Sequence, residues 1–224
     1  MDLGALTPLL AGLVDDAGLF PPAFLPMSQA LARHRAASSP MLSGRFLCQA
    51  NRVDELISVL DGPLDVHLIG ETSVQIPSDP RLTVKAVELR AGLMPELPCY
   101  LEGIAPAKLK DHGVFGKLRC GGAHIPSVDD VATYIREAAY YAIPFKATAG
   151  LHAAVRGWES TNGLEHHGYL NVLVAVSRAI SGGNVPEAIA STDAPGLVAE
   201  ALRLSDDQVL AVRWLFHSYG SCDI

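Results

Sequence analysis

Eight short apolar segments recur along the chain, and helix-like segments lie between many of them. Several of the eight are near-continuous apolar runs, which is typical of parallel strands buried on both faces. This alternation favours an α/β architecture. We therefore predict strands over residues 13–19, 45–49, 64–69, 83–90, 98–103, 115–120, 144–149 and 214–219.

Capping residues mark where several of the predicted helices begin and end. Ser127 precedes Asp129 and Asp130, whose carboxylates complement the helix dipole in the first turn. Asn51 is placed to cap the helix that follows it, and Gly182 closes another. The predicted helices cover residues 27–37, 52–60, 127–142, 168–180 and 206–213.

Eight strands with helices between them leave two architectures open, a closed (β/α)8 TIM barrel and an open, doubly wound sheet. No Gly-rich dinucleotide fingerprint follows the first strand, which weakens the case for the open sheet. Residues 70–81 and 91–97 are too few to hold a full helix. Because no linker-like stretch divides the chain, we predict one compact α/β TIM-barrel domain over residues 1–224, with some helices shortened or missing.

The charge balance and the hydropathy narrow the choice of partners. The net charge of −7 argues against nucleic acid or an anionic membrane surface as the main partner. A local basic pocket can still hold an anionic small molecule. No apolar run approaches the length of a transmembrane helix, so we expect no membrane span.

The cysteines and the first residues bear on the cellular compartment. Residues 1–13 contain no Lys or Arg, unlike the start of a signal peptide. The cysteines are widely spaced and form no CxxC pair, so we expect reduced thiols in a cytoplasmic protein. They are Cys48, Cys99, Cys120 and Cys222.

Charged side chains occur within four of the predicted strands, at positions where a barrel would have side chains that fill its interior. Because side chains alternate along a strand, residues two apart share a face. Buried charges are costly unless they are paired or functional, and functional residues in barrels gather at the carboxyl ends of strands. The pairs that share a face are Lys117 with Arg119, Lys146 with Thr148, Glu88 with Arg90 and Tyr100 with Glu102.

These charge types indicate carbonyl chemistry. Lys117 and Lys146 lie on neighbouring predicted strands, where a second cation and partial burial both lower the pKa of a lysine. The neutral amine is the species that attacks a carbonyl and forms a Schiff base. Glu88 or Glu102 could then move protons, and Arg119 could hold an anionic group.

Three motifs resemble deoxyribose-phosphate aldolase and its class I aldolase relatives. They are residues 116–122 (GKLRCGG), 126–131 (PSVDDV) and 144–151 (PFKATAGL). The resemblance implies that Lys117 is the Schiff-base lysine and that Lys146 is its activating partner. It also matches Glu102 to a fifth-strand glutamate and residues 220–222 to the phosphate loop of the last strand.

The chain departs from that family at two strand positions. Arg119 stands where the family has a small hydroxyl residue, and Glu88 is the nearest match to a fourth-strand aspartate. The patterns at residues 20–23, 146–152, 167–171 and 220–222 also resemble a group of bacterial proteins with no assigned activity. That second resemblance implies nothing about function.

We therefore predict a lyase of the class I aldolase type that acts on a small carbonyl compound, with a phosphate or carboxylate group as an option. No cofactor and no bound metal are expected, and a homo-oligomer is one option for such a barrel. The predicted catalytic residues are Lys117, Lys146, Glu102 and Glu88. The predicted substrate-binding residues are Arg119, Arg90, Asp16, Thr148, His152, Gly150, Gly220 and Ser221.

Two other functions stay open at this stage. His152 and His167 could bind a metal together with Glu102 or Asp16, as in a metal-dependent lyase, isomerase or hydrolase. A barrel that binds a small molecule without converting it is the third hypothesis. Residues 152–167 form a long segment that could act as a lid, with Trp158 as a plug.

Overall fold

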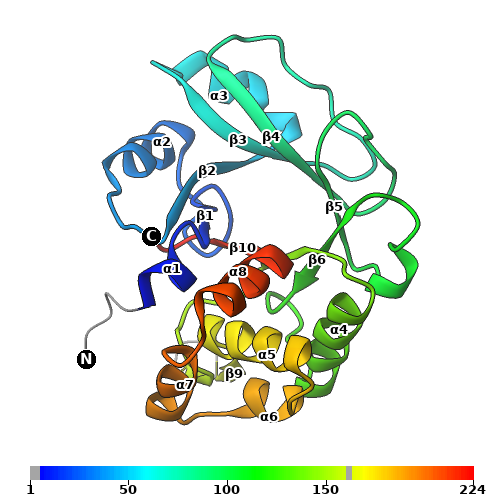
Figure 1. The fold of residues 1–224 in the computed structure, drawn as a ribbon. Coiled ribbons are helices and arrows are strands. Elements are labelled where there is room, and N and C mark those ends of the chain that lie inside the picture. Colours follow the sequence, from blue (N-terminus) through cyan, green and yellow to red (C-terminus); the bar gives the residue numbers. More distant parts are fainter. Residues whose placement is uncertain (1–5, 160–162) are drawn as a thin grey trace.

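Eight parallel strands close into a barrel in this computed structural model, which describes residues 6–159 and 163–224 (Figure 1). The first seven follow chain order round the barrel, and the eighth pairs with both the seventh and the first. The chain therefore has the predicted α/β TIM-barrel fold. Its strands are β1 (Val14–Asp16), β2 (Leu42–Gln49), β3 (Leu64–Ile69), β4 (Leu82–Leu89), β5 (Cys99–Glu102), β6 (Phe115–Arg119), β7 (Phe145–Thr148) and β10 (Phe216–Ser221).

All eight predicted strands overlap a barrel strand, and the largest differences lie at two boundaries. The first strand ends at Asp16, because the Gly18 amide turns back to donate to the Asp16 side chain. The last strand begins at Phe216, because Trp214 still belongs to the preceding helix. Strand identity was therefore predicted better than strand ends, which are the least certain part of such predictions.

The five predicted helices are also present. They are α2 (Met27–Ala36), α3 (Val53–Val59), α4 (Val128–Tyr140), α5 (Tyr169–Ser181) and α8 (Asp206–Leu215). Ser127 and Asp130 form a capping box at the start of α4, and Gly182 ends α5 with a φ of 80°. The prediction that Asn51 caps α3 is wrong, because Asn51 lies inside the short 3-10 helix η2 (Ala50–Arg52).

Three short helices were not predicted: α1 (Thr7–Leu10), α6 (Val185–Ala190) and α7 (Ala194–Ala201). Asn184 caps α6 by accepting from the Glu187 amide, and Asp193 caps α7 by accepting from the Gly196 amide. A proline follows within two residues in both cases, which is a standard start signal. These signals were present in the sequence and were overlooked.

The outer layer of the barrel is uneven. The connections from β3 to β4 and from β4 to β5 contain no helix, as their length predicted, and β5 leads to β6 through the 3-10 helix η3 (Pro106–Lys108). Helices α5 to α8 all lie between β7 and β10 and gather on one side of the barrel (Figure 1). Apolar residues of the helix-free loops, including Val74, Met94 and Leu97, cover the outer faces of the intervening strands.

Helix α5 is the most deeply buried helix of this outer layer. Its residues from Leu170 to Val176 are all buried, and it packs against α4, α6, α7 and α8. A helix that is apolar all round belongs inside a protein. The polar exception is Asn171, whose amide donates to the carbonyls of Ala188 and Ser191 and accepts from the Arg156 amide.

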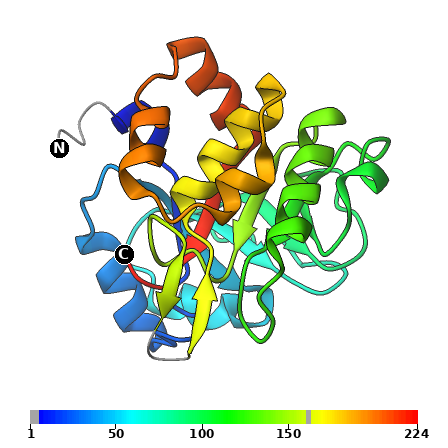
Figure 2. The same cartoon turned by 90° about the horizontal axis from the view of Figure 1, so that it is seen from below.

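The long segment between β7 and α5 contains a small hairpin that the sequence analysis did not predict. Strands β8 (Gly157–Glu159) and β9 (Leu164–His166) pair in antiparallel fashion and lie in front of the barrel in Figure 2. Residues 160–162 of the predicted lid lie outside the described residues. Within the described ranges, every helix is too short or too polar to cross a bilayer.

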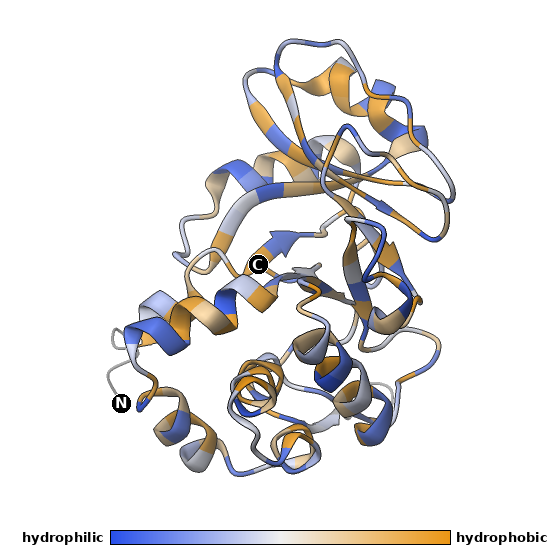
Figure 3. Cartoon of the chain, turned by 45° about the vertical axis from the view of Figure 1, so that its right-hand side comes forward, coloured by the Kyte–Doolittle hydropathy of each residue, from blue (hydrophilic) through white to orange (hydrophobic). Residues whose placement is uncertain are grey.

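The apolar cores lie outside the barrel, between its strands and the surrounding elements. One joins β6, β7 and β10 to helices α4 to α8, and the other joins β2 to β5 to α2 and α3. Figure 3 shows hydrophilic residues, in blue, among the apolar residues of several strands. The outward faces of the strands thus supply apolar packing, which leaves their inward faces available for other side chains.

Replacing Leu173 with Ala should destabilise the protein by about 2–5 kcal/mol, because it removes a fully buried side chain from the centre of α5. Ile180 is the control on the same helix, since it is 46% exposed, and Ile180→Ala should change stability by no more than about 0.5 kcal/mol. Urea unfolding measures both. Equal losses in the two variants would show that α5 is not a core helix.

Candidate active site at the carboxyl ends of the barrel strands

Charged side chains occupy the barrel interior, where most TIM barrels have layers of branched apolar residues. Asp15, Glu88, Lys117 and Lys146 are each at most 4% exposed. Taking a single charge out of water costs several kcal/mol unless it is paired, so each of these groups needs a partner of opposite charge. The contacts between them form one continuous network.

Lys146 lies at the centre of this network. Its Nζ donates to Asp15 Oδ2 at 2.7 Å and to Glu88 Oε1 at 2.5 Å. Asp15 in turn accepts from Ser218 Oγ at 2.7 Å and from Arg45 Nε at 2.7 Å. Lys146 is therefore held between two buried carboxylates, which it joins across the barrel.

These contacts settle the charge of Lys146. Burial alone lowers the pKa of this lysine, but the attraction of Asp15 and Glu88 outweighs it and raises the pKa above its ordinary value. For the two carboxyls, burial raises the pKa, and the nearby cations outweigh it and lower the pKa below the usual range. The expectation that the lysine pair lowers the pKa of Lys146 is therefore wrong, because two anions lie closer to it.

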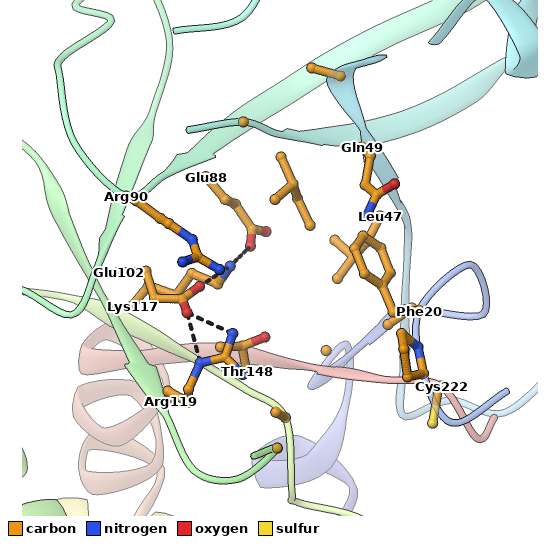
Figure 4. Close-up of a pocket in the computed structure, with 18 of the residues that line it drawn as sticks. Phe20, Leu47, Gln49, Glu88, Arg90, Glu102, Lys117, Arg119, Thr148 and Cys222 are labelled. Carbon is orange, nitrogen blue, oxygen red and sulfur yellow. Dashed lines mark hydrogen bonds and ion pairs between the residues drawn. The ribbon is translucent and has the colours of Figure 1, made fainter. Parts of the chain in front are cut away.

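Lys117 lies beside this group and reaches the surface of a cavity. Its Nζ is 3.0 Å from Glu88 Oε2 and 2.8 Å from Glu102 Oε2. Arg119 Nη2 is 2.7 Å from the other oxygen of Glu102 (Figure 4). Burial raises the pKa of Glu102, but the charges of Lys117 and Arg119 outweigh it and keep the group a carboxylate.

Strand register explains why these groups meet. Glu102 of β5 pairs in register with Lys117 of β6, which pairs with Lys146 of β7. Residues in register on adjacent parallel strands point to the same face, so the three side chains form a row across the barrel wall. Glu88 reaches this row from β4 and contacts both lysines through its two oxygens.

Glu88 Oε2 has an unused bonding capacity. It is buried and lies within ion-pair distance of Lys117, but no donor among the described residues is aligned to hydrogen-bond it. Its other oxygen accepts from Lys146 and lies 2.9 Å from His67 Nδ1. This open oxygen therefore faces Lys117, whereas the other oxygen is shared by Lys146 and His67.

The cavity has a volume of about 1480 Å³ and lies at the carboxyl ends of the strands, where TIM-barrel active sites are found. Glu88, Glu102 and Lys117 line it, whereas Lys146 is below its surface. The predicted binding residues that also line it are Arg119, Arg90, Thr148, Gly150, His152 and Gly220. The structure thus brings nine of the twelve predicted site residues to one cavity.

Two predicted binding residues do not reach the cavity. Asp16 is buried, and its oxygens accept from Arg33 Nη2 and the Gly18 amide and lie 3.1 Å from His34 Nδ1. Ser221 donates its hydroxyl to the carbonyl of Asp223. Because these partners occupy both side chains, their placement gives no support to direct contact with a substrate.

The histidine metal site that stayed open as an alternative is not formed by the described residues. His167 is fully buried, with Arg156 Nη1 3.0 Å from its Nδ1 and the Pro126 carbonyl 2.8 Å from its Nε2. Within the described ranges, the one group with ligand atoms close enough for a metal is Asp15, His67 and Glu88. The Lys146 ammonium bonds to two of those three, and it already supplies the positive charge there.

Several members of the network were missed. Arg45 and His67 contact the buried carboxylates, and Tyr100 lies 2.7 Å from His217 Nδ1, below the lysines. Alternation had already placed Tyr100 on the same face as Glu102. Arg45 and His67 occupy the inward positions of β2 and β3, so the same alternation would have found them. Trp158, the predicted plug, is 71% exposed and does not line the cavity.

Comparison of the chain with protein-family models, with curated proteins and with solved structures found no match. What is known of the site therefore comes from its own geometry. The fold and the cavity define a TIM-barrel protein with a buried lysine–carboxylate network at the usual place of an active site. The aldolase resemblance stays a prediction.

Replacing Lys146 with Met should destabilise the protein by about 3–5 kcal/mol at pH 7, because two buried carboxylates lose a shared cation. The control is Lys85→Met, which breaks an ion pair with Asp65 whose side chains are both 46% exposed. That pair should contribute no more than about 1 kcal/mol. Urea unfolding of both variants provides the measurement.

The pH dependence supplies a second test of the same variant. In the wild type, the lowered pKa values of Asp15 and Glu88 stabilise the fold above about pH 4, and that stability is lost as the pH falls further. In Lys146→Met the buried carboxyls should hold protons at higher pH. The stability deficit of the variant should therefore shrink between pH 7 and pH 5, and a constant deficit would contradict this account.

Proposed function

We propose that the protein is a class I aldolase-type lyase that forms a Schiff base between Lys117 and an anionic carbonyl compound. The observation that carries this proposal is the position of the Lys117 amine. It lies at the surface of a large cavity, between the carboxylates of Glu88 and Glu102. Imine chemistry needs an amine that can reach the substrate and proton carriers beside it, and the two carboxylates can supply the proton carriers.

The two lysines differ in what they can do. Lys146 is inaccessible, donates to two carboxylates and keeps its proton, so it is a poor nucleophile. Lys117 lines the cavity and can meet a substrate. Lys146 is better suited to a positioning role, in which its fixed charge holds Glu88 in place.

The network also tolerates a neutral amine at Lys117. If Lys117 loses its proton, Glu88 still has Lys146, and Glu102 still has Arg119. Neither carboxylate is then left as an unpaired buried charge, which would cost several kcal/mol. Each carboxylate beside Lys117 is thus shared with a second cation.

The reaction would run through imine and enamine intermediates. A carboxylate takes up the proton of the Lys117 ammonium, and the neutral amine attacks the carbonyl carbon. One proton moves from the nitrogen to the carbonyl oxygen, which gives the carbinolamine, and the carboxylic acid returns its proton to the carbinolamine hydroxyl, which leaves as water. The hydroxyl on the β carbon then gives its proton to a carboxylate, the bond between the α and β carbons breaks, its electron pair enters an enamine, and a second carbonyl compound is released. Protonation of the enamine and hydrolysis of the imine return Lys117. Glu102 or the open oxygen of Glu88 would move these protons.

Cations favour a substrate with an anionic group. Arg119 and Arg90 line the same side of the cavity as Lys117, and Figure 4 shows the three side chains close together. Arg90 is 65% exposed and lies 3.5 Å from its exposed partner Glu71, so its guanidinium is only weakly engaged. A carboxylate or phosphate could bind these guanidinium groups in bidentate fashion.

Borohydride reduction in the presence of acetaldehyde, pyruvate or glyceraldehyde 3-phosphate should trap an adduct on Lys117, located by peptide mass spectrometry. Lys117→Met should abolish the adduct. Lys110→Met, at an exposed lysine outside the cavity, should leave it unchanged. Binding of a compound without any trapped adduct would refute the Schiff base and favour a non-catalytic binding protein.

Replacing Glu102 with Gln should slow adduct formation by about 10²–10⁴-fold, because the amide keeps the shape of the side chain but cannot take up a proton. Glu55→Gln, on an exposed part of α3, is the matched control and should have no effect. The rate is followed with the compound that gives the Lys117 adduct. Equal rates in wild type and Glu102→Gln would exclude Glu102 as the proton carrier.

A further inference from the structure

The cavity has a second wall that differs in chemistry from the lysine wall. It is formed by the segment after β1, by β2 and β3, and by the loop after β3, opposite β4 to β7. Figure 4 shows Phe20 and Leu47 across the cavity from Lys117 and Glu102. The Gln49 amide lies beside Leu47 on this side (Figure 4), and the apolar residues around it are Phe20, Pro21, Pro22, Leu47, Ile69 and Val74.

This apolar wall is continuous with the reactive centre. Leu47 is an inward-facing residue of β2 at the base of the cavity, next to Gly220 of β10. Phe20 lies nearer the mouth of the cavity, in the turn that follows β1. A molecule bound at Lys117 could therefore extend along Leu47 towards Phe20 without leaving the cavity.

Size gives an independent argument. Pockets that enclose drug-sized ligands usually measure about 300–1,000 Å³. This cavity is about 1480 Å³, so a three-carbon carbonyl compound would leave most of it filled with water. Water against an apolar wall is unfavourable, whereas burial of an apolar chain there releases it.

The charged wall specifies the other end of the ligand. Lys117 and Arg119 contact the two oxygens of the single Glu102 carboxylate, so their nitrogens lie side by side. A carbonyl at Lys117 and an anionic group at the neighbouring guanidinium therefore have to be close together in the ligand. A 2-oxo acid has its carbonyl and carboxylate on adjacent carbons.

We infer that the cavity takes a 2-oxo acid bearing an apolar chain or ring, with the carboxylate at Arg119 and Arg90 and the apolar group along Leu47 and Phe20. This inference rests on the proposed function for the carbonyl end of the ligand. The assignment of the apolar group rests on the apolar wall alone. That wall predicts binding that strengthens with the length of the ligand's apolar chain, whether or not an imine forms.

The test compares pyruvate, 2-oxohexanoate and 2-oxooctanoate with the matching 2-hydroxy acids, which have no carbonyl to form an imine. Calorimetry gives the affinities, and borohydride trapping gives the adducts. Each fully buried methylene should tighten binding by about fourfold, so the three extra methylenes of the six-carbon acids should tighten binding by up to about 60-fold relative to the three-carbon acids.

Phe20→Ala should weaken the eight-carbon acids and leave the three-carbon acids unchanged. Phe24→Ala is the control, because Phe24 is 67% exposed and does not line the cavity. Leu47→Met keeps an apolar side chain and should retain the dependence on chain length, which guards against a folding defect in the Phe20 variant. Thermal unfolding checks that all three variants are folded.

The outcomes separate the two proposals. Chain-length dependence in the hydroxy acids without any adduct would support the apolar site and refute the Schiff base. A Lys117 adduct whose yield and affinity do not change with chain length, or with Phe20→Ala, would overturn the apolar site and leave the Schiff base standing. Neither adduct nor binding by any of the acids would overturn both.

Discussion

The bonds that Lys146 makes to Asp15 and Glu88 hold the inner structure of this barrel together. They join β1, β4 and β7, which are not neighbours in the barrel, through one ammonium group. In most TIM barrels apolar layers perform that task. Here the apolar clusters lie on the outer faces of the strands, and the interior is held by pairs of opposite charges. Each of these buried charges is costly without its partner.

This arrangement places the two lysines in different surroundings. Lys146 holds its proton and fixes Glu88, while Lys117 lies one strand away at the surface of the cavity. Glu88 and Glu102 each contact Lys117 and a second cation, so a change of charge at Lys117 leaves both carboxylates paired. A reactive amine beside a rigid, charge-balanced support is the physical basis of the proposed imine chemistry. The opposite, apolar wall extends the same cavity and suggests what kind of molecule reaches the amine.

Sequence reasoning succeeded where the signal is local. The apolar runs identified every barrel strand, and alternation placed Glu88, Glu102, Lys117 and Arg119 on inward faces. It failed where the outcome depends on distant partners. Asp16 was expected at the cavity, but Arg33 and the Gly18 amide bind its side chain at the end of β1. The alternative in which His167 binds a metal depended on the same kind of information, and in the structure His167 is buried against Pro126 and Arg156.

The amino-acid sequence alone determined the class of fold and the presence of lysines and glutamates on the inner faces of consecutive strands, because side-chain alternation and apolar periodicity are properties of the local chain. Only the tertiary structure decided which lysine lines the cavity. Lys146 contacts Asp15, which is 131 residues away in the sequence, and Glu88, which is 58 residues away. Such contacts depend on barrel closure and strand register, which no local pattern specifies, and they set the charge of Lys146 and leave Lys117 at the cavity.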